Sequence, residues 1–285
     1  MKLGLSTHSF ATAIHGGRMN LAKIIDFAAQ NGFEGMEIVN SREAWRKDIG
    51  DDIKMNVMRL RERKLRYYCY SVCEDIAAPD ETARWRSMNK VREAILLSSV
   101  TNVPLLCIHG IGSKDETADW DESMKTIVAS LKDCLELAER KRVTLAFANS
   151  GQVLNGAKRM NDVLDAVGSE FLRACIDVAS LLLVEEEPAD VLRELQGSIA
   201  NVYFTDARSS DTYIGNKWTT VRGRQLTPCA VGEGIVPQRE VLYTLKRLDY
   251  AGYVTVLYQG EEEPAVGIER SATYLKTILR EVRNL

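Results

Sequence analysis

Histidine is scarce in this sequence. The 285 residues contain only His8, His15 and His109, so the last 176 positions have none. An excess of one charge is also lacking, because 37 Lys and Arg residues against 40 Asp and Glu residues give a net charge of −3. That balance offers no basic surface for nucleic acid or an anionic membrane. No apolar run approaches the roughly 18 residues of a transmembrane helix. We therefore expect neither nucleic-acid nor membrane partners.

Cysteine pairs with the spacing of a zinc site are missing as well. There are six cysteines, none of them in a CxxC pair: Cys69, Cys73, Cys107, Cys134, Cys175 and Cys229. Four lie in or near apolar strand-like runs, which favours buried, reduced thiols. The N-terminal segment MKLGLSTHSF lacks the long apolar core of a signal peptide. Both observations favour a cytoplasmic protein.

Strand-like and helix-like segments alternate along the whole chain. The strand-like runs are 3–6, 36–39, 67–72, 105–108, 144–148, 174–176, 199–204 and 253–258. Helical periodicity follows Asn20 and Pro79 and covers 52–64, 120–140, 188–195, 237–248 and 271–285. This alternation predicts an α/β fold, a single (β/α)8 TIM barrel over residues 1–285. An open doubly wound sheet is the alternative, although neither GxGxxG nor a Walker loop follows the first strand.

Polar side chains stand at the ends of these strands, and barrel strand ends converge on one pocket. They are His8, Glu37, Glu74, His109, Asn149, Asp177, Tyr203, Asp206 and Tyr258. A histidine that titrates near neutral pH can act as a general acid or base, and carboxylates beside it can tune its pKa. Packing roles for the histidines remain an alternative.

A long polar insertion, at about 208–236, follows the seventh strand. It contains Arg208, Lys217, Trp218, Arg222 and Arg224. One interpretation is a solvated loop. The other is a lid whose arginines hold an anionic substrate and whose tryptophan stacks on a sugar face.

Seven segments in order carry a resemblance to a known family: GLSTHSF, NGFEGMEI, CIHG, TLAFAN, the unit CIDVASLLL…DVLRELQGSIANVYFTDAR, VGEG and DYAGYVTV. The chain resembles the xylose isomerase-like TIM-barrel superfamily, which includes sugar phosphate isomerases and epimerases, inosose dehydratase and endonuclease IV. The resemblance implies a small carbohydrate-like substrate and a homodimer or homotetramer. It also aligns Glu233 with a Gly-Glu-Gly turn beside the pocket. It matches Glu37 to a family glutamate that has either a site role or a structural one.

The same resemblance implies one divalent metal, held by Glu, Asp, His and Glu from strands five to eight. These positions fall at Ala148, Asp177, Tyr203 and Leu257, so only the aspartate is retained. One carboxylate does not hold a hard cation tightly, and we predict that the usual metal site is absent and that no cofactor is needed. A relocated site built from His8, Glu74, His109 and Asp177 is an alternative. Endonuclease activity is excluded, because its zinc cluster needs many histidines and a basic surface.

The resulting functional hypothesis is metal-independent proton transfer on a keto-sugar, cyclitol or related polyhydroxylated substrate, by isomerisation, epimerisation or elimination. We expect His109, Glu74 and Asp177 to be catalytic, and Asn149, Tyr203 or an arginine to stabilise the enolate. The alternative is a degenerate barrel that binds a sugar-like ligand or a protein partner without catalysis.

Overall fold

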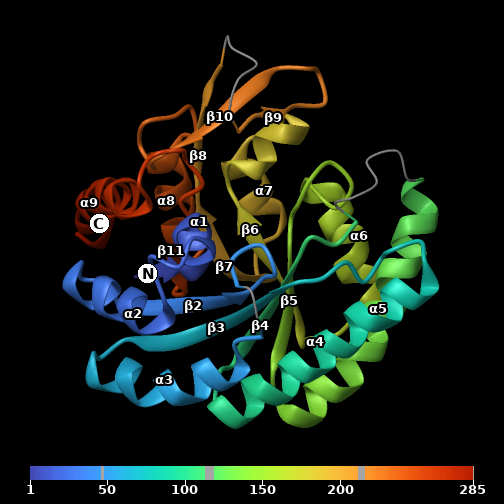
Figure 1. Ribbon diagram of the computed structural model, residues 1–285. Helices are drawn as coiled ribbons and strands as arrows, with labels where there is room; N and C mark the ends of the chain where they lie inside the picture. Colours follow the sequence, from blue (N-terminus) through green and yellow to red (C-terminus); the bar gives the residue numbers. More distant parts are fainter. Residues whose placement is uncertain (46–47, 113–118, 211–215, 285) are drawn as a thin grey trace.

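The computed structural model describes residues 1–45, 48–112, 119–210 and 216–284. Parallel strands close a barrel in the order β1-β11-β7-β6-β5-β4-β3-β2, with helices around it (Figure 1). The barrel strands are β1 (Lys2–Ser6), β2 (Gly35–Asn40), β3 (Arg66–Cys73), β4 (Leu105–His109), β5 (Thr144–Ala148), β6 (Leu172–Asp177), β7 (Ile199–Phe204) and β11 (Tyr253–Val256). The predicted TIM barrel is confirmed.

Helices surround the barrel. They are α1 (Ala11–His15), α2 (Leu21–Gln30), α3 (Gly50–Glu62), α4 (Glu81–Thr101), α5 (Trp120–Lys141), α6 (Ala157–Val167), α7 (Pro188–Glu194), α8 (Gln238–Arg247) and α9 (Pro264–Arg283). In α2 the Asn20 side chain caps the first turn by accepting the N–H of Lys23, and the apolar stripe faces inward. The sequence pattern did not single out α6, and α9 begins before the expected position 271. Leu285, where that helix was expected to end, lies outside the described residues.

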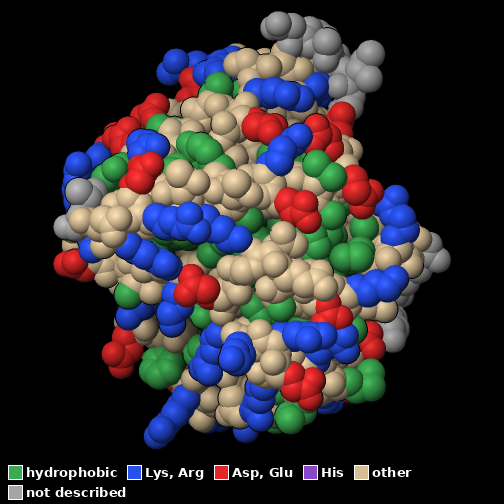
Figure 2. Space-filling view, turned by 90° about the vertical axis from the view of Figure 1, so that its left-hand side faces the viewer, with side chains coloured by type: hydrophobic (Ala, Val, Ile, Leu, Met, Phe, Trp, Pro, Cys, Tyr) green, Lys and Arg blue, Asp and Glu red, His purple; other side chains and the backbone are tan. Residues whose placement is uncertain are grey.

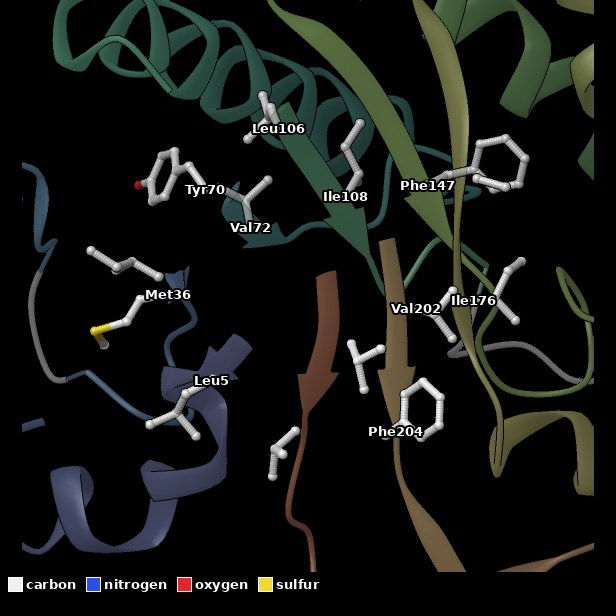
Figure 3. Packing of buried hydrophobic residues seen from close by; sticks show 14 of the residues in the cluster. Leu5, Met36, Tyr70, Val72, Leu106, Ile108, Phe147, Ile176, Val202 and Phe204 are labelled. Atoms are coloured by element: carbon white, nitrogen blue, oxygen red, sulfur yellow. The ribbon is translucent and has the colours of Figure 1, made fainter. Parts of the chain in front are cut away.

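Alternation along each strand divides the core into two regions. One set of side chains lies between strands and helices, where Leu106, Phe147 and Phe204 are fully buried (Figure 3). The other set fills the barrel interior and includes Cys69, Cys107, Cys175 and Tyr203. Each large apolar side chain buried in this way stabilises the fold by roughly 1.5–3 kcal/mol. Because of the same alternation, polar residues near the carboxyl ends of the strands point toward that open end of the barrel, which we call the mouth.

The insertion after β7 contains a small antiparallel sheet in the order β8-β10-β9, at the top of Figure 1. Its strands are β8 (Asp206–Ser209), β9 (Trp218–Thr219) and β10 (Gln225–Cys229). Residues 211–215 of the insertion lie outside the described part. The buried Asp206 carboxylate accepts backbone N–H groups of Ala207, Gly232, Gly234 and Val236 at 2.9–3.1 Å. This carboxylate therefore ties the base of the small sheet to the Gly-Glu-Gly turn.

The surface in Figure 2 carries Lys and Arg side chains interspersed with Asp and Glu, without a broad field of one sign. This distribution agrees with the near-balanced composition. Within the residues that the structure describes, no helix combines the length and apolar character needed to cross a bilayer.

Candidate functional site

Four side chains at the barrel mouth form a hydrogen-bonded cluster around Glu37. This carboxylate is fully buried, and its Oε1 accepts the hydroxyls of Tyr203 and Ser71, each at 2.5 Å. Nε2 of His109 lies 3.2 Å from the Tyr203 hydroxyl and 3.6 Å from Glu37 Oε1. The His109 side chain is 20% exposed whereas the other three side chains are buried. His109 is therefore the member of this cluster that a ligand in the mouth can reach.

Burial and charge together favour an ion pair in this cluster. Burial lowers the pKa of His109, but the Cys107 thiol and the Glu37 carboxylate outweigh it and raise this pKa well above its ordinary 6.5. Because burial raises the pKa of Cys107 far above its usual range, that thiol is neutral, and Glu37 supplies the stabilising charge. Burial also raises the pKa of Glu37, yet the hydrogen bond and charge of His109 lower it overall. At neutral pH the pair is imidazolium and carboxylate.

Tyr203 keeps its proton next to this ion pair. Burial, followed by the neighbouring Cys107 and Glu37, raises the pKa of Tyr203 well above its ordinary value. Its hydroxyl therefore donates to Glu37 and leaves its oxygen to accept the His109 Nε2–H. The phenol links the exposed imidazolium to the buried carboxylate.

Asp177, at the end of β6, is held by its own loop. Its Oδ1 accepts the Thr205 hydroxyl and the backbone N–H groups of Ala179 and Ser180, the latter two at 3.1 and 3.2 Å. Burial raises the pKa of Asp177, although the Thr205 hydroxyl opposes that shift. Asn149 clamps the same strand end, accepting the Asp177 N–H at 2.7 Å and donating to its carbonyl at 3.1 Å. Both side chains are thus fixed by polar contacts at the rim.

The residues at the family's metal positions do not provide a metal-binding set. Ala148 and Leu257 carry hydrocarbon side chains, and the Tyr203 hydroxyl is engaged with Glu37. Asp177 already uses one carboxylate oxygen for three hydrogen bonds. Across 1–45, 48–112, 119–210 and 216–284, no group of three or more His, Cys, Asp or Glu side chains could hold a metal ion. The donors present do not fit the ion that the family implies.

Glu74 lies apart from the His109 cluster. Its carboxylate bonds Lys90 Nζ at 2.7 Å and the Ser87 hydroxyl at 3.1 Å on α4. It lines a cavity of about 770 Å³ between α3 and α4, together with Asn40 and Tyr70. Only its backbone meets the fourth strand end, where the Glu74 N–H donates to the His109 carbonyl at 3.1 Å. The structure thus places Glu37, not Glu74, beside the histidine.

The predicted residues of the insertion lie on the small sheet and its turn. Arg222 is 81% exposed and pairs with Glu185 at 3.0 Å, and Arg224 is exposed. Trp218 is half-buried and packs against the main apolar core. Their roles in substrate binding stay predictions.

Two further predicted residues lie near the last barrel strand and the Gly-Glu-Gly turn. Glu233 pairs with Arg270 on α9 at 2.9 Å. Tyr258 is buried, and its hydroxyl accepts the Glu262 N–H at 3.1 Å. Each has a structural partner, and ligand contact by either side chain stays a prediction.

Sequence reasoning missed two hydroxyls that contact the acids of the site. Ser71 donates to Glu37, and Thr205 donates to Asp177. The available signal was strand parity, because each hydroxyl residue comes two positions after an inward-facing residue: Ser71 follows Cys69 within β3, and Thr205, just after β7, follows Tyr203. Polar residues at such positions face the interior even when they are not the last residue of a strand.

Comparisons with known proteins agree on the architecture. Among solved structures, an L-ribulose 3-epimerase has a TM-score of 0.78 at 15% identity, covering 99% of this chain and 96% of that one. The probable 3-DHS dehydratase AsbF of Bacillus anthracis has 0.76 at 18%, covering 97% and 99%. An IOLI protein with a binding zinc atom has 0.77 at 13%, covering 99% and 98%. At these identities the likeness establishes the fold.

The curated protein sequences include no match to this chain. A sequence model of one family does match, over residues 25–278, and its description is xylose isomerase-like TIM barrel. This match covers most of the chain and agrees with the closed parallel barrel. The chain therefore belongs to the xylose isomerase-like TIM-barrel family.

Proposed function

We propose that this protein catalyses metal-independent proton transfer next to the carbonyl of a keto-sugar, cyclitol or related polyhydroxylated compound. The observation that carries the proposal is the ion pair of Glu37 and His109, bridged by Tyr203, at the mouth of a barrel whose metal-ligand positions are Ala148, Asp177, Tyr203 and Leu257. Two of the solved structures with a similar fold are an L-ribulose 3-epimerase and a probable 3-DHS dehydratase. Their names support proton-transfer chemistry for this chain by analogy.

His109 is the proton-transfer group of the proposed reaction. A base at the mouth takes the hydrogen next to the carbonyl as a proton, and the electrons of the broken C–H bond form an enolate, whose oxygen needs a positive charge or a hydrogen-bond donor. The imidazolium of His109 can supply either this stabilisation or a proton. Glu37 keeps that imidazolium charged, and the protonated Tyr203 hydroxyl links the two groups.

Asp177 and Asn149 are proposed to orient the substrate. Asp177 Oδ1 accepts backbone N–H groups, and its other carboxylate oxygen is proposed to contact the ligand. The Asn149 amide is used by Asp177 and Asn155, so Asn149 acts by holding Asp177 in place. Glu74 was predicted to be the carboxylate partner of His109. In this proposal Glu37 has that role, because Glu37 lies 3.6 Å from His109 whereas Glu74 pairs with Lys90.

Deuterium incorporation tests the proposal directly. The protein, dialysed against a chelator and checked for metal content, is incubated in D2O with D-psicose, D-fructose, L-ribulose and an inosose, and exchange next to the carbonyl is followed by NMR. We expect exchange that survives chelation and that falls at least about 100-fold in His109→Asn for at least one of these substrates. An activity restored only by added metal would contradict metal independence.

A non-catalytic barrel is the second candidate, favoured by the loss of three of the four usual ligand side chains. It predicts saturable binding of one of these sugars by calorimetry without any exchange in D2O. Exchange by the wild type that His109→Asn abolishes would exclude it.

A further inference from the structure

We propose that His8 is a second proton-transfer residue, acting on the face of the substrate opposite His109, so that the reaction is an epimerisation. This assignment rests on the function proposed above and narrows it to one reaction class. His8 lies in the 3-10 turn η1 (Thr7–Phe10) that directly follows β1.

The barrel order places the two histidines on different sides of the mouth. β1 and β4 are separated by β2 and β3, and Glu37 on β2 lies between them in that order. Ser6, two residues before His8, is the register partner of Glu37. The charges that act on His8 are those of Glu43, His109 and Glu37. A substrate above Glu37 would therefore have one imidazole on each side.

A buried ring nitrogen of His8 lacks a partner. Nδ1 of His8 is buried without a hydrogen-bond partner among the described residues. Oγ of Ser6 and Oε2 of Glu37 have no other partner there, and the Ser6 hydroxyl helps to lower the pKa of Glu37. A buried polar atom without a partner costs about 1–3 kcal/mol. Such atoms are uncommon in native structures unless water, ligand or function accounts for them. On the other side, Oε1 of the same carboxylate is fully used by Ser71 and Tyr203.

The two histidines hold opposite protonation states, which is the signature of an acid and base pair. Burial, opposed by Glu43 and reinforced by the positive charge of His109, lowers the pKa of His8 below its ordinary 6.5. The pKa of His109 is raised well above the same value. At neutral pH, His8 is a neutral base while His109 carries a proton.

These states allow a balanced inversion. Neutral His8 takes the proton from the carbon next to the carbonyl, and the electrons of the broken C–H bond form the enolate. The His109 imidazolium then gives its proton to the opposite face of that carbon, which inverts its configuration. His8 ends protonated and His109 neutral. Exchange with solvent, with no oxidant or reductant, restores the starting state.

Hydrogen exchange of the substrate in D2O, measured with single-substitution variants, distinguishes a site with two proton-transfer residues from a site with one. In D2O, His8→Asn should slow exchange of one C3 epimer, D-fructose or D-psicose, by about 100-fold or more while the other epimer stays within about threefold of wild type. His109→Asn should show the reverse preference. His15→Asn, which alters an exposed histidine on α1, is the matched control and should behave as wild type. Circular dichroism and urea unfolding confirm that each variant folds.

Two outcomes overturn the role of His8 while the proposed function stands: wild-type exchange of both epimers in His8→Asn, or equal loss of both in a folded His8→Asn protein. No exchange by the wild type would overturn the proposed function itself.

Histidine NMR gives a readout without substrate, since the three histidine signals can be assigned by single substitution. The assignment requires His8 to titrate below His109, and the opposite order would refute it.

Discussion

Replacing Glu37 by Gln should uncouple His109 from its counter-charge while leaving the shape of the site intact. A glutamine oxygen can still accept the hydroxyls of Ser71 and Tyr203, which lie at 2.5 Å. The change therefore removes mainly the charge that faces His109 Nε2 at 3.6 Å. At an effective dielectric constant of about 20, that separation corresponds to about 4–5 kcal/mol of attraction. Because His109 is 20% exposed, solvent screening reduces the expected coupling to about 2–4 kcal/mol.

The sign of the pH dependence follows from the two pKa shifts. The raised pKa of His109 stabilises the fold below the unfolded value of 6.5, and this contribution is lost as pH rises through the folded pKa. The lowered pKa of Glu37 stabilises the fold above the unfolded value of 4.5, and this contribution is lost as pH falls through the folded pKa. The coupling free energy should therefore be largest between 4.5 and 6.5 and decline at alkaline pH.

A double-mutant cycle of Glu37→Gln and His109→Asn measures this quantity by urea unfolding from about pH 5 to about pH 9. The exposed pair Lys158–Asp162, with a lysine side chain that is 82% exposed, provides a control cycle. Its coupling should stay below about 1 kcal/mol. A Glu37–His109 coupling as small as that of the control, or one that does not change with pH, would refute the ion pair.

Three further substitutions test neighbouring parts of the structure. Asp206→Ala removes the acceptor of four backbone N–H groups and should lower the free energy of unfolding by about 3–5 kcal/mol; a loss below about 1 kcal/mol in urea unfolding would contradict that anchoring. Gly234→Ala would place a Cβ 2.1 Å from Asp206 Oδ1, and should lower the melting temperature and expose the insertion to protease; wild-type protease resistance would argue against it. Tyr203→Phe removes one donor to Glu37 and should raise the pKa of that carboxyl, with a loss of about 1–3 kcal/mol; carboxyl NMR unchanged from wild type would exclude the bond.

The sequence by itself determined the barrel and the convergence of its polar strand ends. Alternating apolar runs and helical stripes define parallel strands with helices outside, and a closed parallel sheet brings the carboxyl ends of its strands to one mouth. His109, Glu37 and Tyr203 could therefore be assigned to one region before any contact was known. The positions of the metal ligands followed from the resemblance of these segments to the family, and the pattern of apolar residues does not contain them.

Only the tertiary structure decided which acid faces His109 and how each group is protonated. Glu37 and Glu74 both stand at strand ends in the sequence, but Glu74 follows the last residue of β3, where strand alternation ends. Its carboxylate lies with Lys90 in the groove between α3 and α4. Protonation depends on burial and on charges from distant segments, which a local pattern does not contain. His8 and His109 are chemically identical in the sequence, and their surroundings in the barrel shift their pKa values in opposite directions.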